Sequence, residues 1–166
     1  MVDIDARISQ IELITGYTFT EKPLCAEALQ MEAPEVSYFI SGSWHLVKKN
    51  KDLESVGDTI IAVVLCTKWY NFRDDQGKRL PVGIWDKLIR QKYLCNKNLA
   101  RAGFAAGIDK CIIKNPGLVR ATNDMVANTM EAVIGAAYLD SNESLDIAGS
   151  IMEKLGLNTH SLLTAP

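Results

Sequence analysis

The sequence predicts an all-α domain, and three features of the 166-residue chain support this prediction. Apolar residues recur three and four positions apart over most of the length, which is the spacing of a buried helix face. Glycine and proline lie between these runs, where they end or begin helices. No run of residues alternates between apolar and polar side chains as a half-buried strand would.

The first half of the chain contains three predicted helices and one long connection. A short helix is expected over 4–16, and a second one begins after Thr20, its expected N-cap, with Pro23 in the first turn. Residues 32–48 contain a proline, a glycine and several aromatic side chains, so we interpret them as a long irregular connection. A long helix is expected over 51–70.

The second half is also predicted to be helical. Four helices are expected, over 82–93, 97–105, 123–139 and 143–155. The last one has a continuous apolar face and stops at Gly156. We therefore predict one domain over residues 1–157 and a flexible tail over 158–166.

Composition and charge limit the classes of function. The net charge is −2 and the isoelectric point is about 5.7, which excludes binding to nucleic acid by overall charge alone. Such binding would need local basic patches beside a metal-neutralised acidic centre. No apolar run has membrane-spanning length, so no membrane contact is expected. No signal segment opens the chain, so we expect a cytoplasmic or nuclear location. The four cysteines lie outside any Cys-x-x-Cys pair, which argues against a structural zinc site.

The helix predicted over 51–70 carries two acidic residues in an unfavourable place. After Thr59 this helix is apolar on almost every side, as expected of a helix in the middle of a domain. Glu54 and Asp58 lie one turn apart near its beginning and share a face, where like charges repel each other. Burial would add to this repulsion. A divalent cation between the carboxylates would compensate for it.

The helix predicted over 123–139 repeats this arrangement. Asn128 and Glu131 are three positions apart on a mostly apolar helix, and small residues after Glu131 would let a neighbouring helix approach closely. If the two helices pack together, four oxygen-bearing side chains converge, and these are ligands that Mg²⁺ prefers. The alternative is that the acids only stabilise helix ends and hold no ligand.

These residues also carry a resemblance to the ribonuclease III family. Residues 50–58 read Asn-Lys-Asp-Leu-Glu-Ser-Val-Gly-Asp and are similar to the family signature Asn-Glu-Arg-Leu-Glu-Phe-Leu-Gly-Asp. Residues 131–140 resemble the second acidic helix of the family. Residues 16–29 resemble its opening motif, and 98–108 resemble its middle. The matches follow one another in the family's order over roughly residues 8–156.

The resemblance implies a ribonuclease III-type helical endonuclease domain that works as a homodimer on double-stranded RNA. It implies Glu54, Asp58 and Glu131 as catalytic residues. Together with Asn128 they would hold Mg²⁺, with Mn²⁺ as the second candidate. The implied reaction is hydrolysis of RNA by a metal-activated water, which leaves 5′ phosphate and 3′ hydroxyl ends.

The chain departs from the family pattern in four places. Asn128 stands where the family has Asp, so we expect weaker metal binding and a slower reaction. Lys51 replaces a Glu and would offset metal charge or contact a phosphate, with a solvated lysine as the alternative. Ser55 replaces the Phe that inserts into the partner subunit, so we expect a modified dimer interface there. Residues 30–33 replace a Thr-His-x-Ser motif. Together these substitutions make single-stranded or imperfectly paired RNA an alternative substrate.

Several basic residues are candidates for contacts with RNA phosphates, although lysine and arginine are most often solvated surface residues. The candidate RNA-binding residues are Lys51, Arg90, Lys92, Lys97 and Arg101. The tryptophans could stack bases, but packing in the core or in loops is the favoured interpretation. No segment resembles a double-stranded RNA-binding domain, so a partner or a longer protein is expected to supply RNA affinity.

Two functions from different classes follow from these observations. The first is a metal-dependent endoribonuclease in RNA processing or RNA silencing, favoured by the retained Glu54, Asp58 and Glu131. The alternative is a catalytically inactive module for RNA binding or dimerisation in a ribosomal or RNA-processing complex. Asn128, Lys51 and Ser55 favour this alternative.

Overall fold

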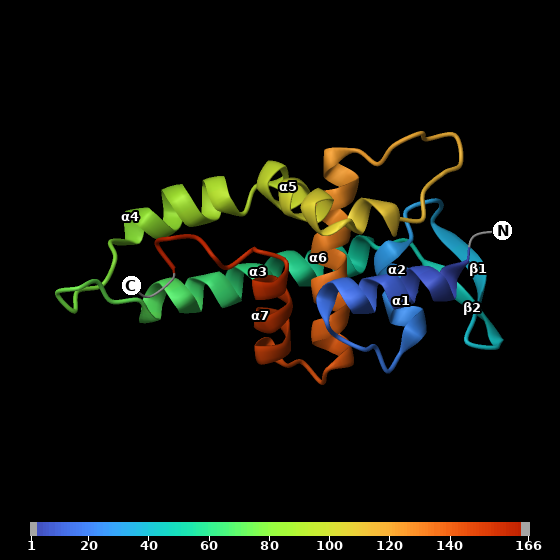
Figure 1. Cartoon of the computed structure of the whole chain (residues 1–166), viewed down its shortest axis with the longest axis horizontal. Coiled ribbons are helices and arrows are strands. Elements are labelled where there is room, and N and C mark those ends of the chain that lie inside the picture. The colour runs from blue at the N-terminus through green and yellow to red at the C-terminus, as the bar shows by residue number, and fades with distance from the viewer. Residues whose placement is uncertain (1–2, 164–166) are drawn as a thin grey trace.

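The computed structural model describes residues 3–163 and places two long helices at the centre of the domain (Figure 1). Helix α3 (Lys51–Asn71) and helix α6 (Asn123–Asp140) cross each other, and the other elements pack around them. Every residue of α6 from 129 to 137 is buried. This segment is therefore the axis of the hydrophobic core.

Glycines make the crossing of α3 and α6 unusually close. A Cβ atom added to Gly57 would lie 1.8 Å from the carbonyl oxygen of Glu131, and one added to Gly135 would lie 2.5 Å from the carbonyl oxygen of Leu53. Neither backbone has room for a side chain at these two points. The contact therefore fixes Glu131 against the first turns of α3, between Glu54 and Asp58.

The surrounding helices agree with the sequence-based predictions to within a few residues, apart from two corrections. The elements are α1 (Ile4–Thr15), α2 (Lys22–Leu29), α4 (Val82–Ile84), η1 (Trp85–Tyr93), α5 (Asn96–Ala106), η2 (Ile108–Lys110) and α7 (Leu145–Lys154). The segment predicted as one helix over 82–93 is α-helical only in its first turn, and η1 is wound as a π-helix. Thr20 is not the N-cap of α2, because the helix begins one residue later than that cap would require.

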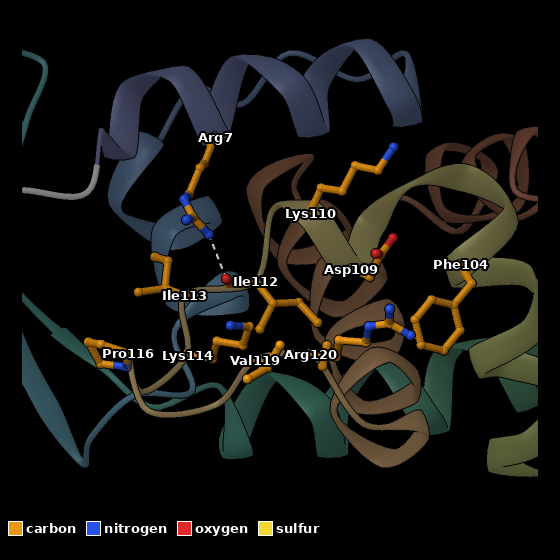
Figure 2. Close-up of a pocket in the computed structure, with 11 residues that line it drawn as sticks. Arg7, Phe104, Asp109, Lys110, Ile112, Ile113, Lys114, Pro116, Val119 and Arg120 are labelled. Atoms are coloured by element: carbon orange, nitrogen blue, oxygen red, sulfur yellow. Dashed lines mark hydrogen bonds between the residues drawn. The ribbon is translucent and has the colours of Figure 1, made fainter.

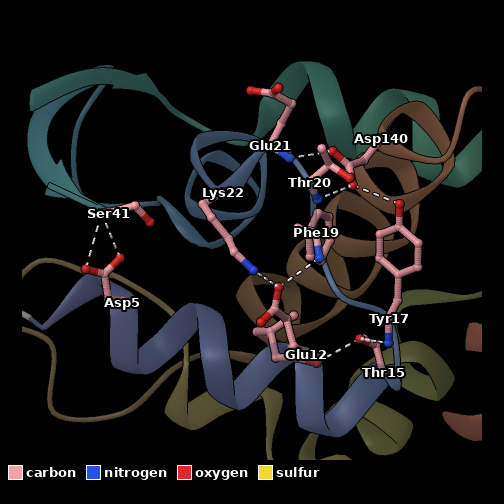
Figure 3. A network of polar contacts seen from close by, with 11 residues as sticks. Asp5, Glu12, Thr15, Tyr17, Phe19, Thr20, Glu21, Lys22, Ser41 and Asp140 are labelled. Atoms are coloured by element: carbon pink, nitrogen blue, oxygen red, sulfur yellow. Dashed lines mark hydrogen bonds and ion pairs between the residues drawn. The ribbon is translucent and has the colours of Figure 1, made fainter. Parts of the chain in front are cut away.

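A carboxylate from the other end of the chain satisfies the beginning of α2 instead (Figure 3). The backbone N–H groups of Thr20 and Glu21 each donate to Asp140 over 2.8 Å, and the Tyr17 hydroxyl donates to the same side chain over 2.8 Å. Burial works against the charge on Asp140, but these hydrogen bonds outweigh it and hold its pKa below the usual range. Asp140 therefore links the end of α6 to the segment between α1 and α2.

The prediction of an irregular connection over 32–48 is wrong, because strands β1 (Glu35–Ile40) and β2 (Ser43–Lys48) form an antiparallel hairpin there. Ser41 and Gly42 have φ values of 49° and 91° and make its two-residue turn. The inner face buries Tyr38, Ile40 and Val47. The outer face exposes Phe39, Trp44 and Leu46 to solvent. Because both faces carry large apolar residues, the alternation that marks a strand is hidden in the sequence. The fold is thus mostly helical, with one small hairpin within residues 3–163.

The last described residues pack against α7. The Asn158 side chain is buried and donates to the carbonyl oxygen of Gly149 over 3.1 Å, and Leu163 is also buried. Residues 164–166 of the predicted tail lie outside the described residues, so the division at residue 157 stays a prediction. Across residues 3–163, no helix has both the length and the apolar character needed to span a membrane.

Candidate metal centre

The beginning of α3 is anchored firmly, which fixes the position of Glu54. Asn50 is buried, its side chain donates to the carbonyl oxygen of Ala28 over 3.2 Å, and its backbone N–H donates to Gln30 over 3.0 Å. The carbonyl oxygen of Asn50 accepts the N–H of Glu54 over 2.9 Å. The Glu54 side chain is 15% exposed, whereas Asp58, one turn later, is exposed. The site therefore opens to solvent on the side of Asp58.

Glu131 supplies the buried acid of the site. It is 6% exposed within α6, in the segment that touches Gly57. Burial, together with the nearby charges of Asp58 and Glu54, raises the pKa of its carboxyl group to about 7, while Lys51 opposes the shift. These interactions show that the two acids of α3 and the acid of α6 lie within electrostatic reach of each other.

Lys51 lies beside these acids, as the sequence comparison with the family signature suggested. Its Nζ atom lies 2.6 Å from Oε1 of Glu54, and the hydrogen bond to this carboxylate raises the pKa of Lys51. The other oxygen of Glu54, Oε2, is buried and accepts no hydrogen bond from residues 3–163. The Lys51 ammonium group therefore satisfies one oxygen of this carboxylate and leaves the other without a hydrogen bond. Their spacing of three positions on a helix is the sequence signal that could have revealed this pair.

The acids are neighbours, but they do not enclose a coordination sphere. Within the part of the chain that the structure describes, no three His, Cys, Asp or Glu residues are grouped closely enough to hold a metal ion. Lys51 holds one oxygen of Glu54, and Asp58 points to solvent. Even so, the donor set fits a hard cation. It consists of three carboxylates, one of which has a buried oxygen without a hydrogen bond, and the half-buried Asn128 one turn before Glu131.

The predicted RNA-binding residues fall into three places. Lys92, Lys97 and Arg101 line one open hollow of about 400 Å³, where Arg101 donates to the Asn98 side chain over 3.0 and 3.2 Å. Arg90 is exposed on η1 and does not line this hollow, and Lys51 lies at the acids. The sequence-based reasoning named none of the uncharged residues of the hollow's wall, which include the exposed Phe104 and Asn123.

Ser55, the predicted dimer contact, is exposed on the first turns of α3. Its hydroxyl donates to the carbonyl oxygen of Lys51 over 3.2 Å. A serine whose hydroxyl bonds to its own helix presents little to a partner, in contrast to an aromatic plug. The role of Ser55 in a dimer stays a prediction.

The chain is similar in sequence to known ribonucleases. The chain is 25% identical over 146 residues to Ribonuclease 3 of Rhodopirellula baltica, covering 86% of the chain and 50% of that protein. It is 28% identical over 143 residues to Ribonuclease 3 of Psychromonas ingrahamii, covering 82% of the chain and 55% of that protein. The chain thus spans about half the length of these curated relatives.

A solved structure has the same fold. It is the nuclease domain of ribonuclease III from Campylobacter jejuni, which matches with a TM-score of 0.70 at 21% identity, over 89% of this chain and 94% of that one. The family model described as the ribonuclease III domain matches residues 51–142, which include α3 and α6 with all four candidate ligands. This match takes up more than half of the 166 residues, so the chain belongs to the ribonuclease III domain family.

Proposed function

We propose that this chain is a metal-dependent endoribonuclease that hydrolyses RNA phosphodiester bonds. One observation supports the proposal above the others: Glu131 is buried beside two further acids, and burial with their charges raises its pKa to about 7. Such a group destabilises the folded protein in its ionised form unless a cation is present. A catalytic centre that holds a divalent metal ion accounts for this arrangement.

Each residue of the centre has a distinct proposed part. Glu54, Asp58 and Glu131 would hold Mg²⁺ or Mn²⁺ through carboxylate oxygens, and Asn128 would contribute an amide oxygen without charge. A divalent ion bound there would supply an activated water and neutralise charge that develops on the phosphate. Lys51 competes with the ion for Glu54, so metal binding would release its ammonium group toward solvent and toward an incoming phosphate.

The partners in this proposal are RNA and a second copy of the chain. The related structure from Campylobacter jejuni shows structural flexibility in a region that is involved in dimer formation. By analogy we infer a homodimer with a modified contact at Ser55. The substrate would be double-stranded RNA, with single-stranded RNA as the alternative, in RNA processing or RNA silencing. Residues 1–157 would form the functional domain.

One alternative function has specific support. Lys51 already neutralises part of Glu54, and Asn128 removes one charge from the ligand set. Both features suit a domain that has lost catalysis and serves as an RNA-binding or dimerisation module.

A cleavage assay separates the two functions. The purified chain would be incubated with end-labelled double-stranded and single-stranded RNA in Mg²⁺, in Mn²⁺ and in chelator, beside the double variant Glu54→Ala/Glu131→Ala. We expect cutting that requires metal and is lost in the variant. Intact RNA in every arm, with RNA binding retained, would support the non-catalytic module instead.

A further inference from the structure

A second cavity lies apart from the acids, between α1, the end of α5, η2 and the connection that leads into α6 (Figure 2). Its volume is about 760 Å³, which is within the range of small-molecule binding sites. None of the four candidate metal ligands lines it. It is therefore a separate concave site on the same domain.

The wall of this cavity is strongly basic in a chain whose net charge is −2. Its charged residues are Arg7, Lys110, Lys114, Arg120 and one acid, Asp109. The nearest sequence neighbours among the cations are four positions apart, and Arg7 comes from the opposite end of the chain. The fold thus gathers four positive charges around one space with a single negative charge to balance them, and an anion in that space would relieve their repulsion.

Two of the four cations are held in place by backbone carbonyl groups. Arg7 donates through one guanidinium nitrogen to the carbonyl oxygens of Cys111 and Ile112, over 3.0 and 2.5 Å. Figure 2 shows the bond to Ile112. Because a guanidinium group carries five N–H donors, others remain for a ligand. The Lys114 ammonium group donates to the carbonyl oxygen of Leu118. These two residues form a fixed part of the wall.

The other two cations are free to adapt. Lys110 and Arg120 are exposed, and their side chains form no hydrogen bond or ion pair with residues 3–163. Both suit a phosphate group that approaches them, since arginine offers paired donors and lysine a compact charge. The site therefore combines two fixed and two adjustable donors.

The remaining wall is apolar, which narrows the class of ligand. Ile112 and Ile113 are buried at the cavity, while Phe104 is 41% exposed and Val119 is 92% exposed at its edge. An exposed aromatic ring beside basic side chains is the arrangement on which nucleic-acid bases stack. Phe104 also lines the hollow of Lys97 and Arg101, so one ring borders both basic sites.

We propose that this cavity binds the phosphate monoester of a nucleotide, with the base against Phe104. Such a group comes either from the 5′ end of an RNA strand or from a free mononucleotide. The RNA-end form rests on the proposed function, because it would anchor a strand near the hollow of Lys97 and Arg101, which shares Phe104 with the cavity. The free-nucleotide form would stand without it.

Binding is measured by fluorescence anisotropy in chelator, so that no cleavage takes place. The probes are a short single-stranded RNA with a 5′ phosphate, the same RNA with a 5′ hydroxyl, and adenosine 5′-monophosphate as competitor. The test variant is Lys110→Ala/Arg120→Ala, and Lys78→Ala/Lys87→Ala is its charge-matched control at exposed positions outside the cavity. Glu54→Ala/Glu131→Ala is tested in parallel.

We expect the test variant to bind the phosphorylated RNA about tenfold more weakly or worse, and the control to bind it as the wild type does. Preference for phosphorylated over hydroxyl RNA, with weak competition by the mononucleotide, assigns the site to RNA ends. Equal binding of the mononucleotide assigns it to free nucleotides. If the test variant and the control variant bind equally weakly, or if the wild type does not prefer the phosphorylated probes, the proposal is overturned. Because Glu54→Ala/Glu131→Ala should bind normally, failure of cleavage and failure of this site are distinguishable.

Discussion

Replacing Glu131 with glutamine should stabilise the metal-free protein at alkaline pH. The glutamine has nearly the same shape but carries no charge into the core. Its carbonyl oxygen and amide group occupy the space of a carboxyl group that is 6% exposed and close to Asp58 and Glu54. The substitution thus removes the unfavourable ionisation and leaves the packing of α3 on α6 intact.

The size of the effect follows from the pKa of Glu131. Its pKa of about 7 in the folded protein lies above the ordinary value of 4.5. Each pKa unit corresponds to about 1.4 kcal/mol, so the ionised carboxylate lowers the free energy of unfolding by about 3 kcal/mol at pH 8. The folded protein binds the Glu131 proton more tightly than the unfolded protein does. The stability that comes from the protonated carboxyl group is therefore fully present below pH 4.5 and is lost as the pH rises through 7.

The assay is urea unfolding of the wild type and of Glu131→Gln in chelator between pH 4.5 and 8. We expect the variant to be more stable by about 2–3 kcal/mol at pH 8 and nearly equal at pH 4.5. Glu153→Gln, at an exposed position of α7, is the control and should change little at any pH. A variant that is less stable than the wild type at pH 8, or a difference that does not change with pH, would refute the reasoning.

Three further predictions test other parts of the structure. Gly57→Ala should lower the free energy of unfolding by several kcal/mol, about 2–5, because its Cβ would overlap the Glu131 backbone, and chemical denaturation would measure this. Asn128→Asp should raise the affinity for Mn²⁺ and speed RNA cleavage, because it adds a charged ligand, and an unchanged affinity in a Mn²⁺ titration would count against its place in the site. Asp140→Ala should destabilise the protein by about 1–3 kcal/mol at pH 7, because it removes the charged acceptor of three hydrogen bonds. Since the pKa of Asp140 is lowered on folding, its contribution is lost as the pH falls, and thermal unfolding at pH 7 and pH 3 should show the difference shrinking.

Helix spacing in the sequence was a good guide to the centre of the fold. The apolar runs of α3 and α6 and the small residues after Glu131 predicted two buried helices in close contact. The contact and the burial of α6 are confirmed, but α3 is buried along one face only, since Val63 is 39% exposed. The pairing of Glu54 with Asp58, and of Asn128 with Glu131, followed from helix geometry alone. That the four side chains act as metal ligands stays a prediction.

Features made by residues far apart in sequence, or by unusual strands, could not be predicted in this way. The hairpin was missed because Phe39, Trp44 and Leu46 face solvent, where polar residues mark a typical strand. The basic cavity combines Arg7 with Arg120, and no local spacing connects them. The link between Asp140 and the start of α2 likewise depends on tertiary contact and overrides the local capping signal at Thr20.

The most direct test of the proposed metal centre is calorimetric titration of the protein with Mn²⁺ near pH 7, in two buffers with different heats of ionisation. If Glu131 is a ligand, binding should release a proton from its carboxyl group, because the ion requires the ionised form. We predict saturable binding with proton release in the wild type, and loss of both in Glu131→Gln. Equal binding by the wild type and the variant, or no binding by the wild type, would contradict the assignment of this helix crossing as a metal centre.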